Sequence, residues 1–311
     1  MKTKQIPLIL MFLLACGISN SQTLAEKLGY KSTDKLLIIN CDDVGMCHSA
    51  NLAVIDGMEN GLITSATIMV PCPWFNEIAA YASSHPEKDF GVHLTHTSEW
   101  KFYRWGSVAP RDQVNGLYDS EGYLWRSIEE VYLNSNPEEA YIEGRAQIQK
   151  AIKAGVPVTH IDSHMGTMQY RPDYLDAYIR LSLEFNLPLR MAAQSTMEAF
   201  GFKELRRQFE QKGIVFTDYF VYDELENYND VKSFWISIIK TLKPGVIELF
   251  IHASKESEEL KAITNSWRKR VQEAATFTSD PDIKKLIADE KIILTGYRPL
   301  MELQRKNIKT K

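Results

Sequence analysis

The sequence predicts an α/β fold in which parallel strands form a TIM-like (β/α) barrel, closed or incomplete. Three observations support this prediction. Strand-like and helix-like stretches alternate from residue 35 onward, about eight stretches are strand candidates, and neither a linker nor an internal repeat divides the chain. The 311 residues, of which 44% are hydrophobic, are therefore expected to form a single domain over about 34–311.

The expected elements follow from apolar runs and from residues that stop them. Apolar and β-branched runs predict strands over 36–40, 63–70, 90–95, 158–163, 187–191, 214–221, 246–253 and 292–295. Apolar residues at helical spacing predict helices over 49–60, 74–84, 137–154 and 172–184. Gly61 and Gly155 follow two of these helices, as glycine commonly does at a helix C-terminus.

The first 21 residues resemble a signal peptide and are not expected to form part of the fold. Lys2 and Lys4 precede an apolar run over 6–15 that is too short to span a bilayer. Two processing routes fit: the stretch ending at Cys16 resembles a lipobox, which would anchor the protein by a lipid on Cys16, and residues 19–21 suit ordinary signal peptidase. We expect an exported protein that is periplasmic, secreted or lipid-anchored at the cell envelope, with no transmembrane segment.

Charge and cysteine content exclude several classes of protein. The net charge is −4, so no nucleic-acid partner is expected. The four cysteines lack the paired spacing of a structural zinc site and are too few for a disulfide scaffold. Cys41, beside two aspartates, is interpreted as a packed thiol. The sequence leaves the oligomeric state open, a homodimer included.

Three of the expected strands end in residues that bind metals. These are Asp42 and Asp43 after the first strand, His93 in the third, and His164 after the fourth. The carboxyl ends of parallel strands meet at one rim, where two histidines and a carboxylate can hold a divalent ion and leave positions for water and substrate. Because side chains alternate along a strand, Asp42 and Asp43 are expected to point differently, so that one binds metal and the other accepts a proton from water.

Three further residues are candidates for supporting roles. His160, Asp162 and His164 share one strand face by parity, and His164 lies nearest the rim. Asp162 or His160 is expected to orient His164, with a core histidine as the alternative for His160. His252 follows a late strand and can donate a proton to a leaving group, with a solvated loop histidine as its alternative.

Taken in order, several short motifs resemble the YdjC-like carbohydrate deacetylases, the family of the chitooligosaccharide and hopanoid-associated deacetylases. They are residues 40–45 (NCDDVG), 63–67 (ITSAT), 91–95 (GVHLT), 159–164 (THIDSH), 189–190, 248–252 and 296–298 (GYR). The resemblance implies a barrel related to polysaccharide deacetylases. It also implies one divalent metal ion, magnesium or zinc, and hydrolysis of an acetyl group from an N-acetylated amino sugar or oligosaccharide.

The resemblance also implies a role for each matched residue. It implies Asp43, His93 and His164 as metal ligands, Asp42 as general base and His252 as general acid, and Arg190 as a residue that positions the base or the substrate. The chain departs from the pattern after His164, where the family usually has further histidines, and after His252, where a proline is usual. These departures keep two alternatives open: a glycan-binding barrel without catalysis, and a metal hydrolase of an ester or phosphate.

A long loop at about 96–127 interrupts the alternation and is rich in aromatic residues. Aromatic rings at the mouth of a site can stack on sugar rings, and the residues nearest His93 in sequence are the preferred sugar contacts: Trp100, Tyr103, Arg104 and Trp105. The alternative is that the aromatic residues form a small core that fixes the loop.

Overall fold

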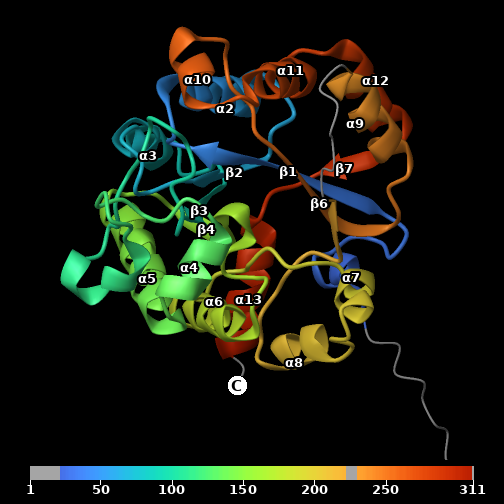
Figure 1. Cartoon of the computed structure of the whole chain (residues 1–311). Coiled ribbons are helices and arrows are strands. Elements are labelled where there is room, and N and C mark those ends of the chain that lie inside the picture. The colour runs from blue at the N-terminus through green and yellow to red at the C-terminus, as the bar shows by residue number, and fades with distance from the viewer. Residues whose placement is uncertain (1–21, 222–229, 310–311) are drawn as a thin grey trace, which may run out of the picture.

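The computed structural model describes residues 22–221 and 230–309, and the expected signal segment with Cys16 lies outside these ranges. Seven strands within them form one parallel sheet in the order β4-β3-β2-β1-β6-β5, and β7 pairs with the first half of β1 (Figure 1). The strands are β1 (Lys35–Val44), β2 (Ser65–Ile68), β3 (Phe90–Leu94), β4 (Val158–Ser163), β5 (Tyr219–Val221), β6 (Gly245–Ile251) and β7 (Ile292–Leu294).

The sheet curls into a half-barrel, and helices surround it (Figure 1). They are α1 (Leu24–Lys27), α2 (His48–Asn60), α3 (Phe75–Ser84), α4 (Ile128–Asn134), α5 (Pro137–Lys153), α6 (Pro172–Phe185), α7 (Gln194–Ala199), α8 (Leu205–Gln211), α9 (Val231–Lys240), α10 (Glu258–Ile263), α11 (Trp267–Thr278), α12 (Pro281–Asp289) and α13 (Arg298–Lys309). No pairing among the described residues joins β4 to β5, so the barrel is incomplete on that side. The predicted α/β class and barrel-like fold are confirmed.

Alternation along β1 separates two hydrophobic cores. Leu37 and Ile39 belong to the large core between the sheet and its helices, whereas Leu36 and Ile38 belong to a small core inside the curl. Tyr297, just before α13, belongs to the small core as well. Parallel strands buried on both faces read as continuous apolar runs, which is the pattern of residues 36–39.

Of the expected strands, one is replaced by an isolated bridge and another is shorter than predicted. Residues 187–191 form only an isolated bridge, Leu189 with Ile161, because Pro188 has no N–H for a ladder. Residues 214–218 precede β5 without joining it, since the Val215 N–H is donated to the Gln304 side chain at 2.8 Å. The β4 strand, by contrast, has the predicted bounds.

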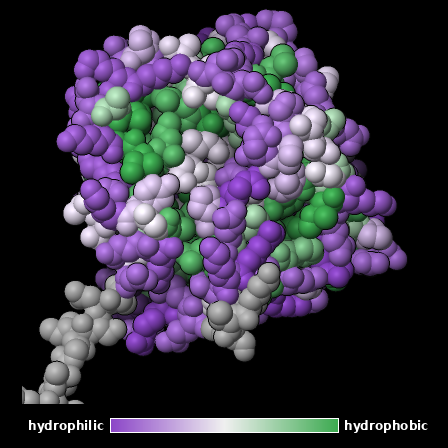
Figure 2. All heavy atoms as spheres, turned by 180° about the vertical axis from the view of Figure 1, so that it is seen from behind, coloured by the Kyte–Doolittle hydropathy of each residue, from purple (hydrophilic) through white to green (hydrophobic). Residues whose placement is uncertain are grey.

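The loop at about 96–127 contains two short 3₁₀ turns, Arg111–Gln113 and Asn115–Leu117, and one isolated bridge between Tyr118 and Leu124. Glu143 of α5 holds the middle of the loop, because its carboxylate accepts hydrogen bonds from the backbone N–H groups of Val108 and Ala109, the shorter contacts being 2.9 and 2.8 Å. Across residues 22–221 and 230–309, no helix is both long and apolar enough to cross a membrane. The face opposite the view of Figure 1 is mostly hydrophilic, with hydrophobic side chains in separate patches (Figure 2).

Candidate metal centre and catalytic cavity

A cavity of about 300 Å³ lies at the carboxyl ends of the strands. Asp42 and Asp43 line it from the end of β1 and His93 from β3, and His164 and His252 line it from the turns after β4 and β6. The structure therefore brings together five residues that lie up to 210 positions apart in the sequence. This is the convergence expected at the carboxyl edge of a parallel sheet.

Asp43 departs from the regular strand. Its φ angle is 61°, in the left-handed region, and the pairing of β1 with β2 changes register between Cys41 and Val44. Aspartate tolerates this region better than most residues. Both carboxylates line one cavity, but Asp42 pairs with Arg190 whereas Asp43 pairs with Arg270, so the two have different partners as expected.

Three donor atoms in this cavity form a nearly regular triangle. Asp43 Oδ1 lies 3.3 Å from His93 Nε2 and 3.3 Å from His164 Nδ1, and these two nitrogens are 3.2 Å apart. Bonds of about 2.0–2.2 Å to one ion would place neighbouring donors roughly 3 Å apart. Asp43 Oδ1 is buried and has no hydrogen-bond partner among the described residues. The donor set and its unpaired oxygen thus fit a divalent ion.

Each of the two histidines is held on its other nitrogen by a carboxylate. His93 Nδ1 lies 2.6 Å from Asp162 Oδ1, and His164 Nε2 lies 3.1 Å from Glu99 Oε2. Asp162 was expected to orient His164, but it follows the register of β4 with β3, which places it opposite His93. A carboxylate on one ring nitrogen leaves the other nitrogen free to bind a metal.

The carboxylates keep both histidines charged in the absence of metal. Burial lowers their pKa values, but Asp162 outweighs burial at His93 and raises its pKa to about 10. Glu99 and Asp43 likewise raise the pKa of His164 to about 9. Near neutral pH the protonated forms of His93 and His164 are therefore favoured, and a metal ion would have to displace their protons in order to bind.

Arg190 holds Asp42 in a bidentate pair. Its NH1 and NH2 groups donate to Asp42 Oδ2 at 2.7 Å and to Oδ1 at 2.8 Å, and its Nε donates to Glu248 Oε1 at 2.8 Å. Burial raises the pKa of Asp42, but Arg190 outweighs burial and brings this pKa below its ordinary range. Asp42 is therefore ionised and can accept a proton. Arg190 was predicted to position either the base or the substrate, and its contacts with Asp42 fit the first role.

His252 stands at the open side of the cavity, with its side chain 24% exposed. Its Nε2 lies 3.9 Å from Asp43 Oδ2, and its backbone N–H is donated to Glu273 at 2.8 Å. Burial lowers the pKa of His252 to about 4, in spite of the nearby Asp43. The imidazole is neutral near pH 7 and has to gain a proton before it can donate one.

His160 lies below the cavity in the interior of the barrel. Its ring stacks on Tyr297, with centroids 3.8 Å apart and planes within 5°. Gly91 leaves room for this ring, since a Cβ there would come within 2.6 Å of it. His160 makes no described hydrogen bond to Asp43, His93 or His164, so the structure places it as a core histidine.

Arg270 and Glu99 are two charged residues among the cavity residues that sequence reasoning missed. Arg270 projects from α11 and donates to Asp43 Oδ2 at 2.6 Å, which leaves Oδ1 to face the histidines. Glu99 is the residue of the long loop that lines the cavity. Neither residue lies in a motif or at a strand end, so no local signal in the sequence indicates it.

The four expected sugar contacts do not line the cavity. Trp100, Tyr103 and Trp105 pack against one another, with Trp100 and Trp105 centroids 5.3 Å apart. Arg104 donates to Asp119 at 2.7 Å within the same loop. Trp100 and Trp105 belong to the large core and Tyr103 packs against it, so these rings fix the loop, in line with the alternative interpretation of the aromatic segment.

Replacing Arg190 by Met is expected to lower the free energy of unfolding by about 3–5 kcal/mol, because three buried carboxylates would lose their shared cation. These are Asp42, Asp162 and Glu248, all within 3.0 Å of the guanidinium. Urea unfolding measures the loss. The matched control is Arg180→Met, whose exposed pair with Glu138 contributes about 0–1 kcal/mol. Equal, small losses in both variants would contradict the prediction.

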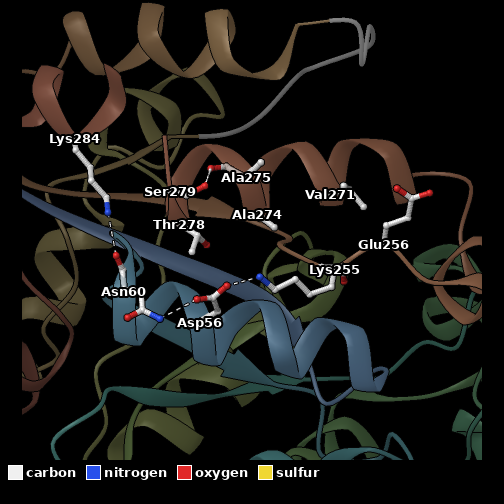
Figure 3. Close-up of a pocket in the computed structure, with 11 residues that line it drawn as sticks. Asp56, Asn60, Lys255, Glu256, Val271, Ala274, Ala275, Thr278, Ser279 and Lys284 are labelled. Carbon is white, nitrogen blue, oxygen red and sulfur yellow. Dashed lines mark hydrogen bonds and ion pairs between the residues drawn. The ribbon is translucent and has the colours of Figure 1, made fainter. Parts of the chain in front are cut away.

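A larger cavity of about 510 Å³ lies between α2 and α11 (Figure 3). Its charged groups are paired with neighbours: Lys255 with Asp56, and Lys284 with the backbone oxygen of Asn60 at 3.0 Å. None of the predicted site residues lines it. The chemistry is therefore assigned to the smaller cavity.

The fold and the smaller cavity define an α/β half-barrel protein whose strand ends carry the donors for one divalent ion. The chain belongs to the YdjC-like family, because the model of that family, described as YdjC-like protein, matches residues 36–289. This confirms the family resemblance.

Individual relatives agree with this assignment over most of their length. A carbohydrate deacetylase of Thermoanaerobacter pseudethanolicus is 29% identical over 265 residues, which cover 85% of this chain and 98% of the relative. A carbohydrate deacetylase of Thermus thermophilus is 31% identical over 276 residues, or 86% and 94% of the two chains. A solved structure from Enterococcus faecalis V583, described as a cellobiose-phosphate cleavage protein, has a TM-score of 0.73 at 27% identity and covers 86% of this chain and 99% of its own.

Proposed function

We propose that this protein is a metal-dependent carbohydrate deacetylase that removes the acetyl group from an N-acetylated amino sugar or oligosaccharide. The observation that carries the proposal is the triangle formed by Asp43, His93 and His164 beside the ionised Asp42 in one cavity. The deacetylases among its relatives support the choice of reaction.

The residues divide the work of amide hydrolysis. Asp43, His93 and His164 would hold the ion, magnesium or zinc, which lowers the pKa of a bound water and polarises the carbonyl oxygen. Asp42, kept ionised by Arg190, accepts a proton from the attacking water as the new C–O bond forms. His252, once protonated, gives a proton to the nitrogen as the C–N bond breaks. The products are acetate and a free amino sugar.

We also propose that the protein is exported, and this part of the proposal is based on the N-terminal pattern alone. Residues 1–21 have the basic start and short apolar run of a signal peptide. An exported deacetylase would meet glycans outside the cytoplasm, either freely or anchored through Cys16. Comparing the N-terminus and lipid content of the protein in envelope and soluble fractions separates the two processing routes.

Acetate release from a panel of N-acetylated saccharides tests the proposed reaction. The protein is stripped of metal with a chelator and then supplied with zinc or magnesium. Acetate that appears only after metal is restored is the expected result, and it identifies the sugar as well. Release of phosphate or an ester product in place of acetate would assign another hydrolase, and glycan binding without any product would favour a barrel that has lost catalysis.

A further inference from the structure

We propose that Glu99, in the long loop, is a positioning residue for His164, so that each metal-binding histidine is held by its own carboxylate. This inference rests on the proposed function, since it concerns the metal site of that reaction. It adds a role for a residue of the loop that no strand-end motif contains.

The contacts of the two histidines are equivalent but use opposite ring nitrogens. His93 presents Nε2 to Asp43 and has Nδ1 against Asp162. His164 presents Nδ1 to Asp43 and has Nε2 against the Glu99 carboxylate, 3.2 and 3.1 Å from its two oxygens. A neutral imidazole that donates Nε2–H to Glu99 has its lone pair on Nδ1, at the metal position. Glu99 therefore selects the tautomer and the ring orientation that His164 needs.

The loop holds Glu99 from both sides. The preceding residue, Ser98, donates its N–H to the Trp125 oxygen at 2.7 Å and accepts the Trp105 N–H on its hydroxyl at 3.0 Å. The following residue, Trp100, packs on Trp105 and accepts a hydrogen bond from Arg126 on its carbonyl oxygen at 3.1 Å. The aromatic packing of the loop thus has a function at the site, which is to hold one carboxylate beside His164.

The geometry gives Glu99 a different role from that of Asp43. Two groups of donor atoms lie within 4.8 Å of one another, those of Asp43, His93 and His164 and those of Asp42, His93 and Asp162, and Glu99 is in neither group. Its carboxylate faces the nitrogen of His164 that points away from Asp43. Glu99 therefore acts on the metal through His164.

Zinc affinity, measured without substrate at one fixed pH by competition with a chromophoric chelator, tests the inference. Glu99→Ala is expected to bind zinc about 10–100-fold more weakly than the wild type. Glu99→Gln is expected to lose less, because its amide oxygen still accepts from Nε2–H. Asp162→Asn, which makes the same carboxylate-to-amide change on His93, is the reference for the loss in Glu99→Gln.

The matched control is Glu121→Gln in the same loop. Glu121 is 64% exposed and contacts Arg104 and Arg126 at 3.6 and 3.7 Å, away from the cavity, so its zinc affinity should equal that of the wild type. An unchanged affinity in Glu99→Ala, or an equal loss in Glu121→Gln, would overturn the role of Glu99 and leave the proposed function intact. A wild-type protein that binds no divalent ion would overturn both.

Discussion

Replacing Asp43 by Ala is expected to remove zinc binding and acetate release together. Asp43 supplies the only carboxylate oxygen in the donor triangle of the described residues, and the two histidines that remain would repel one another when protonated. Loss of a metal that contributes several kcal/mol to the transition state corresponds to about 10³-fold or more in kcat/KM. Zinc content after dialysis and the rate of acetate release, measured on the same preparation, check both parts of the prediction.

A second substitution separates the loss of the ligand from the loss of the turn. Alanine at position 43 would carry the left-handed φ angle of 61° at a cost of about 1–2 kcal/mol, whereas asparagine tolerates it. Both variants deprive the buried Arg270 of its carboxylate partner, so Asp43→Asn is expected to unfold at a higher temperature than Asp43→Ala and still lack zinc and activity. If Asp43→Asn kept both, Asp43 would not be a ligand.

Asp42→Asn is expected to show the opposite combination, with zinc retained and turnover reduced by about 10²–10⁴-fold. Asparagine fills the same space and leaves Arg190 paired with Asp162 and Glu248, so the cavity keeps its shape. It has no ionised oxygen to accept a proton from water. Zinc affinity and kcat, determined side by side with Asp43→Asn, distinguish a proton acceptor from a metal ligand. Full activity in Asp42→Asn would exclude Asp42 as the base.

The positions of the site residues were predictable from the sequence because they depend on one rule. Carboxyl ends of parallel strands share an edge, so polar residues that end apolar runs must meet there, and the cavity does contain Asp42, His93, His164 and His252. Their roles as ligands, base and acid stay predictions that the variants above will test. The parallel pairing of the strands that carry them follows the predicted α/β class, whereas their order was not predicted.

The features that sequence reasoning missed depend on contacts between distant parts of the chain or on a local departure from the alternation of side chains along a strand. Arg270 meets Asp43 across 227 positions, and Glu99 meets His164 across 65. The left-handed turn at Asp43 interrupts the alternation from which its direction was predicted. Residue spacing contains no information about such contacts, and only the packed loop and α11 bring these groups to the cavity.

The backbone at Asp43 also restricts how this protein can evolve. Position 43 needs both a left-handed conformation and a carboxylate, and glutamate, which keeps the charge, does not share the tolerance of aspartate for that conformation. Asparagine and glycine keep the turn but abandon the ligand. A descendant that retained the barrel after losing this ligand would therefore be expected to carry one of these two residues here. A single letter of an aligned sequence would then mark the lineages in which the ligand has been lost.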